Sequence, residues 1–154
     1  MPSTYAHYVF GKRMLELFPE DVAAVVRADR QLYDIGLHGP DILFYYHVLT
    51  NNKVNAVGFG THARPAKEFF APAKAAVEKG GAPAFAYLVG FLCHFALDVT
   101  CHSYIENKIA VSNVRHTEIE REFDRFLLGK DGKETLSAKL TGHIFPTAEN
   151  AHVI

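Results

Sequence analysis

The amino-acid sequence predicts an all-α fold, a single-domain bundle of several helices with a metal site in its core. Apolar residues recur at helical spacing along most of the 154 residues. No stretch of any length alternates between apolar and polar residues, as a half-buried strand would. Proline and glycine divide the chain into helix-sized segments. We expect one domain over 1–154, with a weakly defined tail over 130–154.

The first half of the chain begins with two predicted helices. Residues 5–18 have helical spacing, with Ser3 or Thr4 as the N-cap and Pro19 after the last turn. A second helix over about 20–30 opens with acidic residues, which the helix dipole favours at that end. The segments that follow are predicted as a turn over 33–40, an aromatic-rich stretch over 42–50 and a loop over 51–60.

The second half is predicted to be more strongly helical. A helix over 64–78 closes at Gly80 and Gly81, and a long central helix covers 83–106. Further helices are predicted over 113–128 and, more briefly, 134–140. The apolar run of 82–93 is shorter than the roughly 20 residues that cross a bilayer, so we interpret it as a core helix and expect no transmembrane segment.

Charge and composition exclude some functions and favour others. The net charge is −1 with the nine histidines neutral, so no basic field indicates nucleic acid, and no specific nucleic-acid partner is expected. No signal peptide is recognisable at the N-terminus, which predicts a cytoplasmic protein. Cys93 and Cys101, on one helix, would lie about 12 Å apart, too far for a disulfide. The sequence leaves the oligomeric state open.

The central motif is His94-x-x-x-Asp98 with His102 four residues later. On a helix these positions lie about 40° apart around the axis and one turn apart in height, so they share one stripe. Burying an aspartate between two histidines is costly unless a cation compensates. His116 and Glu120 repeat this i, i+4 spacing on the next helix, with ligand types that suit zinc. Either motif alone is equally consistent with a histidine packed in the core or with a solvated helix face. The occurrence of both motifs in succession favours metal binding.

These motifs, in their order, resemble the zinc-dependent phospholipase C family, including its uncharacterised bacterial branch and, more distantly, P1 nuclease-type enzymes. The residues that carry the resemblance are the opening 1–7 with His7, the stretch 36–41 ending in Gly39-Pro40-Asp41, His62, His94-x-x-x-Asp98, His102 and His116-x-x-x-Glu120. The resemblance implies an all-α fold of the phospholipase C and P1 nuclease type.

The resemblance also implies metal ligands, taken over by position. The implied sets are His62, His94 and Asp98 for one zinc; His102, His116 and Glu120 for a second; and His7 for a third, bridged to the first by Asp41. Secreted relatives complete the third set with an N-terminal Trp, whereas this chain has no Trp. Met1 or a processed Pro2 would substitute, or that metal binds weakly or not at all. The gap from Asp98 to His102 is also shorter than in those relatives, which leaves His102 the least secure ligand.

The function implied is zinc-dependent hydrolysis of a phosphoric ester by metal-activated water, with Asp41 orienting that water. Two or three Zn²⁺ ions are expected, with iron, nickel or manganese as alternatives, and the substrate is a small phosphodiester or a phospholipid. Two alternatives stay open: a non-catalytic or degenerate metal-binding protein of the same fold, and a nuclease-like phosphodiesterase.

Residues around this set remain less defined. His38 is either a site residue or a structural residue of the turn, and His47 is expected to pack in the core. No partner is predicted for His143 or His152. Aromatic residues form either an apolar wall of the site or, as we favour, ordinary core: Phe44, Tyr45, Tyr46, Phe59 and Tyr104.

Overall fold

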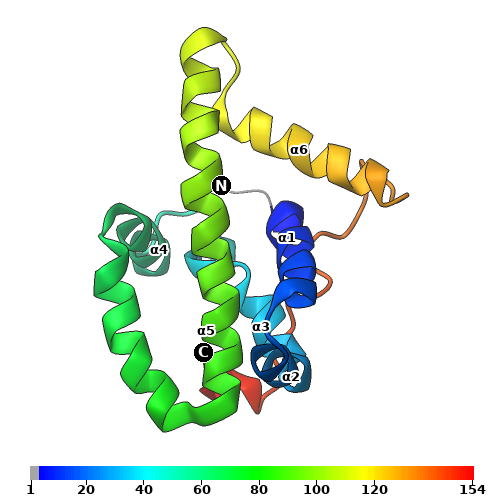
Figure 1. Ribbon diagram of the computed structural model, residues 1–154. Helices are drawn as coiled ribbons and strands as arrows, with labels where there is room; N and C mark the ends of the chain where they lie inside the picture. Colours follow the sequence, from blue (N-terminus) through cyan, green and yellow to red (C-terminus); the bar gives the residue numbers. More distant parts are fainter. Residues whose placement is uncertain (1–3) are drawn as a thin grey trace.

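The computed structural model describes residues 4–154, and its regular elements are all helices, as predicted (Figure 1). No strand occurs in this range. The elements, in chain order, are α1 (Thr4–Leu17), α2 (Glu20–Ala28), α3 (Arg30–Gly36), the 3-10 helix η1 (Gly39–Tyr45), α4 (Lys53–Ala63), α5 (Ala66–Val111), α6 (His116–Lys130) and the 3-10 helix η2 (Asn150–His152).

Helix α5 is the axis of the fold and contacts α1, α2, α3, η1 and α6. It bends sharply at Gly81, whose φ of 66° and ψ of −148° lie outside helical geometry. Glycine adopts such a positive φ without steric cost. Figure 1 shows the two limbs of α5 side by side as a U, with α4 beside its open end. The break at the predicted Gly80-Gly81 stop is therefore confirmed.

The core lies where α1, α2 and α3 pack on the second limb of α5. Gly36 and Gly90 allow α3 and α5 to approach closely, because a Cβ on either would collide with the backbone of the other helix. Tyr33 is fully buried there and donates its hydroxyl proton to the carbonyl oxygen of Gly11 at 2.8 Å. This close packing fixes the side of α5 that carries His94.

Three predicted segments were wrong. The chain is helical over Arg30–Gly36, where a turn was expected, and over Lys53–Ala63, where a loop was expected. The Asn52 side chain starts this second helix by accepting from the amides of residues 54 and 55, each at 3.0 Å. The predicted helix over 134–140 is absent from the described chain; there Glu134 accepts from the Leu136 amide, a local bond that competes with helix formation.

The cysteines are both free, as their separation predicts, with Cys93 buried and Cys101 half-buried. Helix α5 is long and apolar enough to cross a membrane by length and composition alone. A single such helix is weak evidence for a membrane span, because the core helix of a soluble protein has the same properties.

Candidate metal centre

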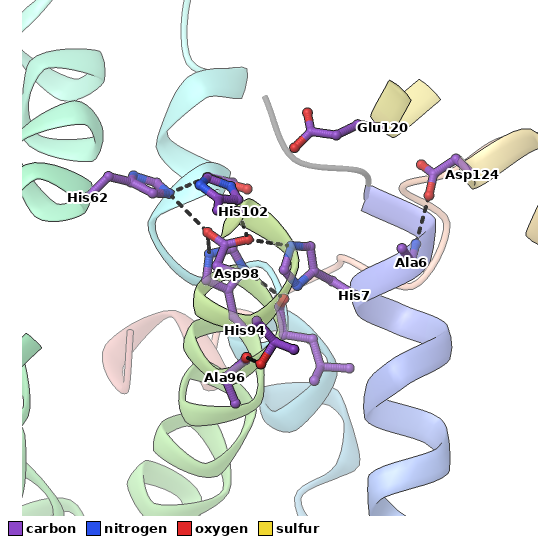
Figure 2. A network of polar contacts seen from close by, with 12 residues as sticks. Ala6, His7, His62, His94, Ala96, Asp98, His102, Glu120 and Asp124 are labelled. Atoms are coloured by element: carbon purple, nitrogen blue, oxygen red, sulfur yellow. Dashed lines mark hydrogen bonds and ion pairs between the residues drawn. The ribbon is translucent and has the colours of Figure 1, made fainter. Parts of the chain in front are cut away.

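Histidine and carboxylate side chains from five helices converge on the second limb of α5 (Figure 2). The structure brings every metal ligand implied by the resemblance into one of three groups, within which the ligand atoms lie no more than 4.8 Å apart. The groups are His62, His94 and Asp98; His102, His116 and Glu120; and His7, Asp41 and His94.

Asp98 lies at the middle of the centre and faces four imidazoles. Its Oδ1 lies 3.3 Å from His7 Nε2 and 3.9 Å from His102 Nε2. Its Oδ2 lies 3.4 Å from His94 Nε2 and 3.7 Å from His62 Nε2. The two oxygens of one carboxylate are thus directed at different histidine groups, an arrangement in which a carboxylate can bridge two cations.

Asp41 enters the same centre from η1. Its Oδ1 lies 3.0 Å from His62 Nε2, and its carboxylate also groups with His7 and His94. The resemblance implied that Asp41 is the bridging carboxylate. The structure places a second carboxylate, Asp98, between the same histidines.

Backbone carbonyl groups determine which nitrogen of His94 and His62 faces the carboxylates. His94 Nδ1 lies 3.2 Å from the Leu37 carbonyl oxygen, and His62 Nδ1 lies 2.9 Å from that of Gly58. A carbonyl oxygen only accepts, so Nδ1 carries the proton in both rings. In the neutral rings the unprotonated Nε2 then points at carboxylate oxygens. A lone pair facing an anion is repulsive, and a cation between the two relieves the repulsion.

Burial makes this arrangement costly without a cation. Within the described residues, no hydrogen bond reaches Nε2 of His94 or of His102, although both atoms are buried. The same holds for His7 Nδ1. An unsatisfied buried polar atom carries its full desolvation cost, on the order of 1–3 kcal/mol. Imidazole nitrogens and carboxylate oxygens are the ligand types that zinc takes, so the donor set fits that ion.

The pKa shifts of Asp98 and His7 favour an ionised carboxylate beside a neutral imidazole, whereas the Asp41 carboxylate raises the pKa of His62. Burial raises the pKa of Asp98, but the adjacent imidazoles of His7 and His94 outweigh it and hold that pKa below its usual range. Burial lowers the pKa of His7, whose ring stacks on that of His94 with centroids 4.2 Å apart. Two stacked imidazolium ions would repel each other. Neutral rings around a carboxylate are the protonation state that a divalent cation requires.

The group on α6 is built differently. His116 Nε2 and Glu120 Oε1 lie 2.8 Å apart across one helical turn, and the His102 ring from α5 meets the His116 ring edge-on at 5.0 Å. Burial raises the pKa of Glu120, while the hydrogen bond from His116 opposes that rise. The i, i+4 spacing predicted this pair, and the contact of α6 with α5 adds His102.

Two cavities flank the stripe of Asp98 and His102 on α5. The first has a volume of about 300 Å³ and combines His62 and Asp98 with Arg64 and an apolar wall; the second, of about 360 Å³, combines His7 and Glu120 with apolar side chains. The wall of the first cavity consists of Phe69, Phe70, Phe91 and Phe95. Phe69 and Phe91 stack with ring centroids 3.9 Å apart.

The aromatic residues singled out in the sequence have other positions. Phe44 is buried, as expected of core, but Tyr45, Tyr46, Phe59 and Tyr104 are exposed, so the core interpretation was wrong for these four. Tyr104 lines the second cavity. The helical sequence around His94 had indicated Phe91 and Phe95 only as packing residues, and no local signal identified Phe69 or Phe70, which face them across the bend of α5.

The remaining histidines are separate from the three groups. His38 is buried, and its Nε2 lies 2.7 Å from Nε2 of His143, whose ring stacks on Tyr8 at 4.0 Å. His143 therefore has the partner that the sequence could not supply. His47 is exposed with a φ of 45°, and its ring meets that of Tyr46 edge-on at 4.3 Å, so it packs on an aromatic neighbour outside the core. His152 is exposed. Met1 and Pro2, the substitutes for the missing Trp, and Ser3, an alternative N-cap, lie outside the described residues.

The family model described as zinc dependent phospholipase C matches residues 6–152. No curated protein and no solved structure matches the chain.

Proposed function

The chain belongs to the zinc-dependent phospholipase C family, and from this premise we propose that it is a zinc-dependent hydrolase of phosphodiesters whose substrate is a phospholipid. The observation that carries the proposal is the convergence of four imidazoles on Asp98, two of them with Nδ1 bonded to the backbone and Nε2 directed at carboxylates. That geometry is suited to cations and poorly suited to an apo core.

The proposed ligands are the three groups described above, which favour two or three ions. When bound, zinc supplies a Lewis acid that neutralises charge on a phosphoryl oxygen and lowers the pKa of water. Asp98 belongs to the group of His62 and His94, and its Oδ1 also faces His7 and His102 of the other two groups. Leu37 and Gly58 orient His94 and His62 through their carbonyl oxygens. Asp41 lies beside His62, which lines the first cavity, and its carboxylate can accept a proton or orient water.

The first cavity supports a substrate that is charged at one end and apolar at the other. Its lining includes His62, Asp98 and Arg64, whose guanidinium is suited to a phosphate. The apolar part of the lining includes Phe69 and Phe70, with Phe69 stacked on Phe91. An aliphatic chain would bury apolar surface there, worth about 25 cal/mol per Å² removed from water. A phospholipid satisfies both ends; a small hydrophilic diester satisfies only one.

The test is hydrolysis of paired substrates by the zinc-loaded protein. We expect a short-chain phosphatidylcholine to be cleaved with a higher kcat/KM than a diester of the same headgroup that lacks acyl chains. Phe70→Ala is expected to reduce that preference, because it removes part of the cavity wall. Phe126→Ala, which changes an exposed aromatic on α6, is the matched control. Equal rates on both substrates would count against phospholipid, and no cleavage of either would count against hydrolysis.

Two rival functions give different results in the same preparation. A degenerate metal-binding protein would bind zinc without cleaving any diester. A nuclease-like phosphodiesterase would cleave single-stranded oligonucleotides faster than lipid, with no effect of Phe70→Ala on that rate. The aromatic lining beside His62 favours a substrate with an apolar part.

A further inference from the structure

A buried carboxylate outside the three groups connects two of the helices that carry them. Asp124 of α6 is 6% exposed, and it accepts two hydrogen bonds from backbone amides in the first turn of α1. Its Oδ2 lies 3.1 Å from the Tyr5 amide nitrogen and its Oδ1 lies 2.8 Å from that of Ala6. Figure 2 shows the contact to Ala6 immediately beside His7.

These amides lie at the first turn of α1, where helix geometry leaves N–H groups without intrahelical partners. Capping groups usually come from the residue before the helix. In this protein one cap is supplied by a side chain 118 and 119 positions away in the sequence. The charge of a carboxylate also suits the positive end of the helix dipole. Asp124 therefore fixes where the first turn of α1 begins relative to α6.

The position of that turn determines the position of His7. His7 follows Ala6 directly, is 3% exposed, and reaches Asp98 Oδ1 through Nε2 at 3.3 Å. Its Nδ1 is buried and makes no hydrogen bond in the described chain, so no backbone carbonyl within residues 4–154 orients this ring. His94 and His62 each have such a carbonyl. The ring is placed instead by its stacking on the His94 ring and by the position of α1, whose first turn Asp124 holds.

Asp124 also lies four residues after Glu120, on the same buried face of α6. Around it, Leu127 and Leu128 pack on Tyr5 and Ala6 in one apolar cluster. One side chain thus fixes α1, which carries His7, against α6, which carries Glu120. The two groups meet across the second cavity, which both His7 and Glu120 line.

We propose that Asp124 is a positioning residue for the metal held by His7. It acts through the first-turn amides of α1 and takes the orienting role that backbone carbonyls have for His94 and His62. This inference rests on the proposed metal-dependent function. Asp124 is not itself a ligand. It holds His7 in place in the part of the site where secreted relatives have a Trp, which this chain lacks.

The experiment titrates zinc into the metal-free full-length protein and measures the number of ions bound and their affinities by calorimetry. Co²⁺ absorption in the visible range then reports the ligand geometry of each ion. We expect Asp124→Ala to weaken one ion by roughly 10–100-fold, the usual cost of losing an outer-shell partner. His7→Ala is expected to weaken the same ion. The double variant is expected to resemble His7→Ala alone, because Asp124 acts through His7.

Two controls separate this role from general stabilisation of the α1–α6 contact. Tyr5→Phe removes the hydrogen bond from the Tyr5 hydroxyl to Asp131 Oδ2, 2.6 Å long, which joins the same two parts of the chain without touching the amides. It is expected to leave all zinc affinities unchanged. If Asp124→Ala does not fold, Asp124→Asn keeps the side-chain volume and one acceptor oxygen, and a smaller loss of the same ion is expected.

The outcomes are distinguishable. If the wild-type protein binds no zinc, the proposed function fails. If it binds zinc and Asp124→Ala and Asp124→Asn bind it with wild-type affinity, or if Tyr5→Phe weakens the ion as much as Asp124→Ala does, the positioning role of Asp124 is wrong.

Discussion

His94 Nδ1 lies 3.2 Å from the carbonyl oxygen of Leu37, across 57 positions of the sequence. Because that oxygen only accepts, the proton of the neutral ring is on Nδ1 and the lone pair of Nε2 faces Asp98 Oδ2 at 3.4 Å. The backbone just before Gly39-Pro40-Asp41 thus sets the protonation of a proposed ligand on α5. Gly39 of that stretch also determines how closely the His94 ring can approach the backbone.

Gly39→Ala is expected to abolish binding of the zinc held by His94. The residue has a φ of 49°, and a Cβ there would collide with the His94 ring. The ring must move, which breaks its alignment with both Leu37 and Asp98. Backbone strain alone costs on the order of 1–3 kcal/mol, so a lower unfolding temperature is expected too. Zinc titration and thermal unfolding measure the two effects.

Gly132→Ala is the matched control for that substitution. Gly132 has a φ of 67°, but a Cβ there meets no atom within 4 Å. It should lower the unfolding temperature without changing zinc affinity. Similar losses of zinc in both variants would show that backbone strain, and not the approach to His94, governs the site.

Asp98→Asn is expected to remove more than one ion. Its two oxygens face histidines of different groups, and the amide keeps the size of the side chain while it loses the charge. The affinity loss should exceed the roughly 10–100-fold cost of an outer-shell substitution, since the carboxylate is itself a proposed ligand. Metal content after dialysis provides the measurement, with Asp21→Asn, on the exposed start of α2, as the control. Loss of a single ion would contradict the shared role.

The parts of this centre that the sequence predicts are those that lie on one helix. The stripe of His94, Asp98 and His102 follows from helical periodicity alone, and so does the pair of His116 and Glu120. The distance of His7 from Asp98 depends on how α1 packs on α5, and periodicity carries no information about it. Before the structure, only the resemblance to the zinc-dependent phospholipase C family indicated that His7 and Asp98 belong to one centre.

The wrong secondary-structure predictions have local physical causes. Gly58 and Gly60 lower the helix propensity of residues 53–63, so the sequence there predicts a loop. In the structure Gly58 is buried and leaves room for the Phe44 ring, while Asn52 caps the first turn. Packing therefore overrides propensity in α4, the helix that carries His62. The contact of His38 with His143 spans 105 positions and ends in irregular chain, where no pattern could reveal it.

Removal of metal is expected to destabilise the protein. Without a cation, Asp98 faces imidazole lone pairs, and buried nitrogens of His94 and His102 have no hydrogen bond in the described chain. A ligand at 1,000 times its Kd stabilises a fold by about 4 kcal/mol. Thermal unfolding with and without a chelator, followed by zinc readdition, measures this effect. A transition that does not move on chelation would contradict a structural contribution of the metals.

The pair of His38 and His143 predicts how the stability of the metal-free protein depends on pH. Burial is the main cause that lowers the pKa of His38 to about 3 and that of His143 to about 4, from an ordinary value of 6.5. Because these folded-state values lie below the unfolded one, the unfolded chain binds more protons between about pH 6.5 and 4. The contribution of the pair is therefore complete above pH 6.5 and decreases as the pH falls toward 4.

His143→Gln tests this dependence because it removes one of the two titrating groups and keeps a polar side chain beside His38. Measured by urea unfolding of the metal-free protein, its free energy of unfolding should fall less steeply than that of wild type between pH 6.5 and 4.5. His152→Gln, which changes an exposed histidine of η2, should retain the wild-type slope. The same slope in all three proteins would mean that the hydrogen bond between His38 and His143 does not exclude protons from the fold.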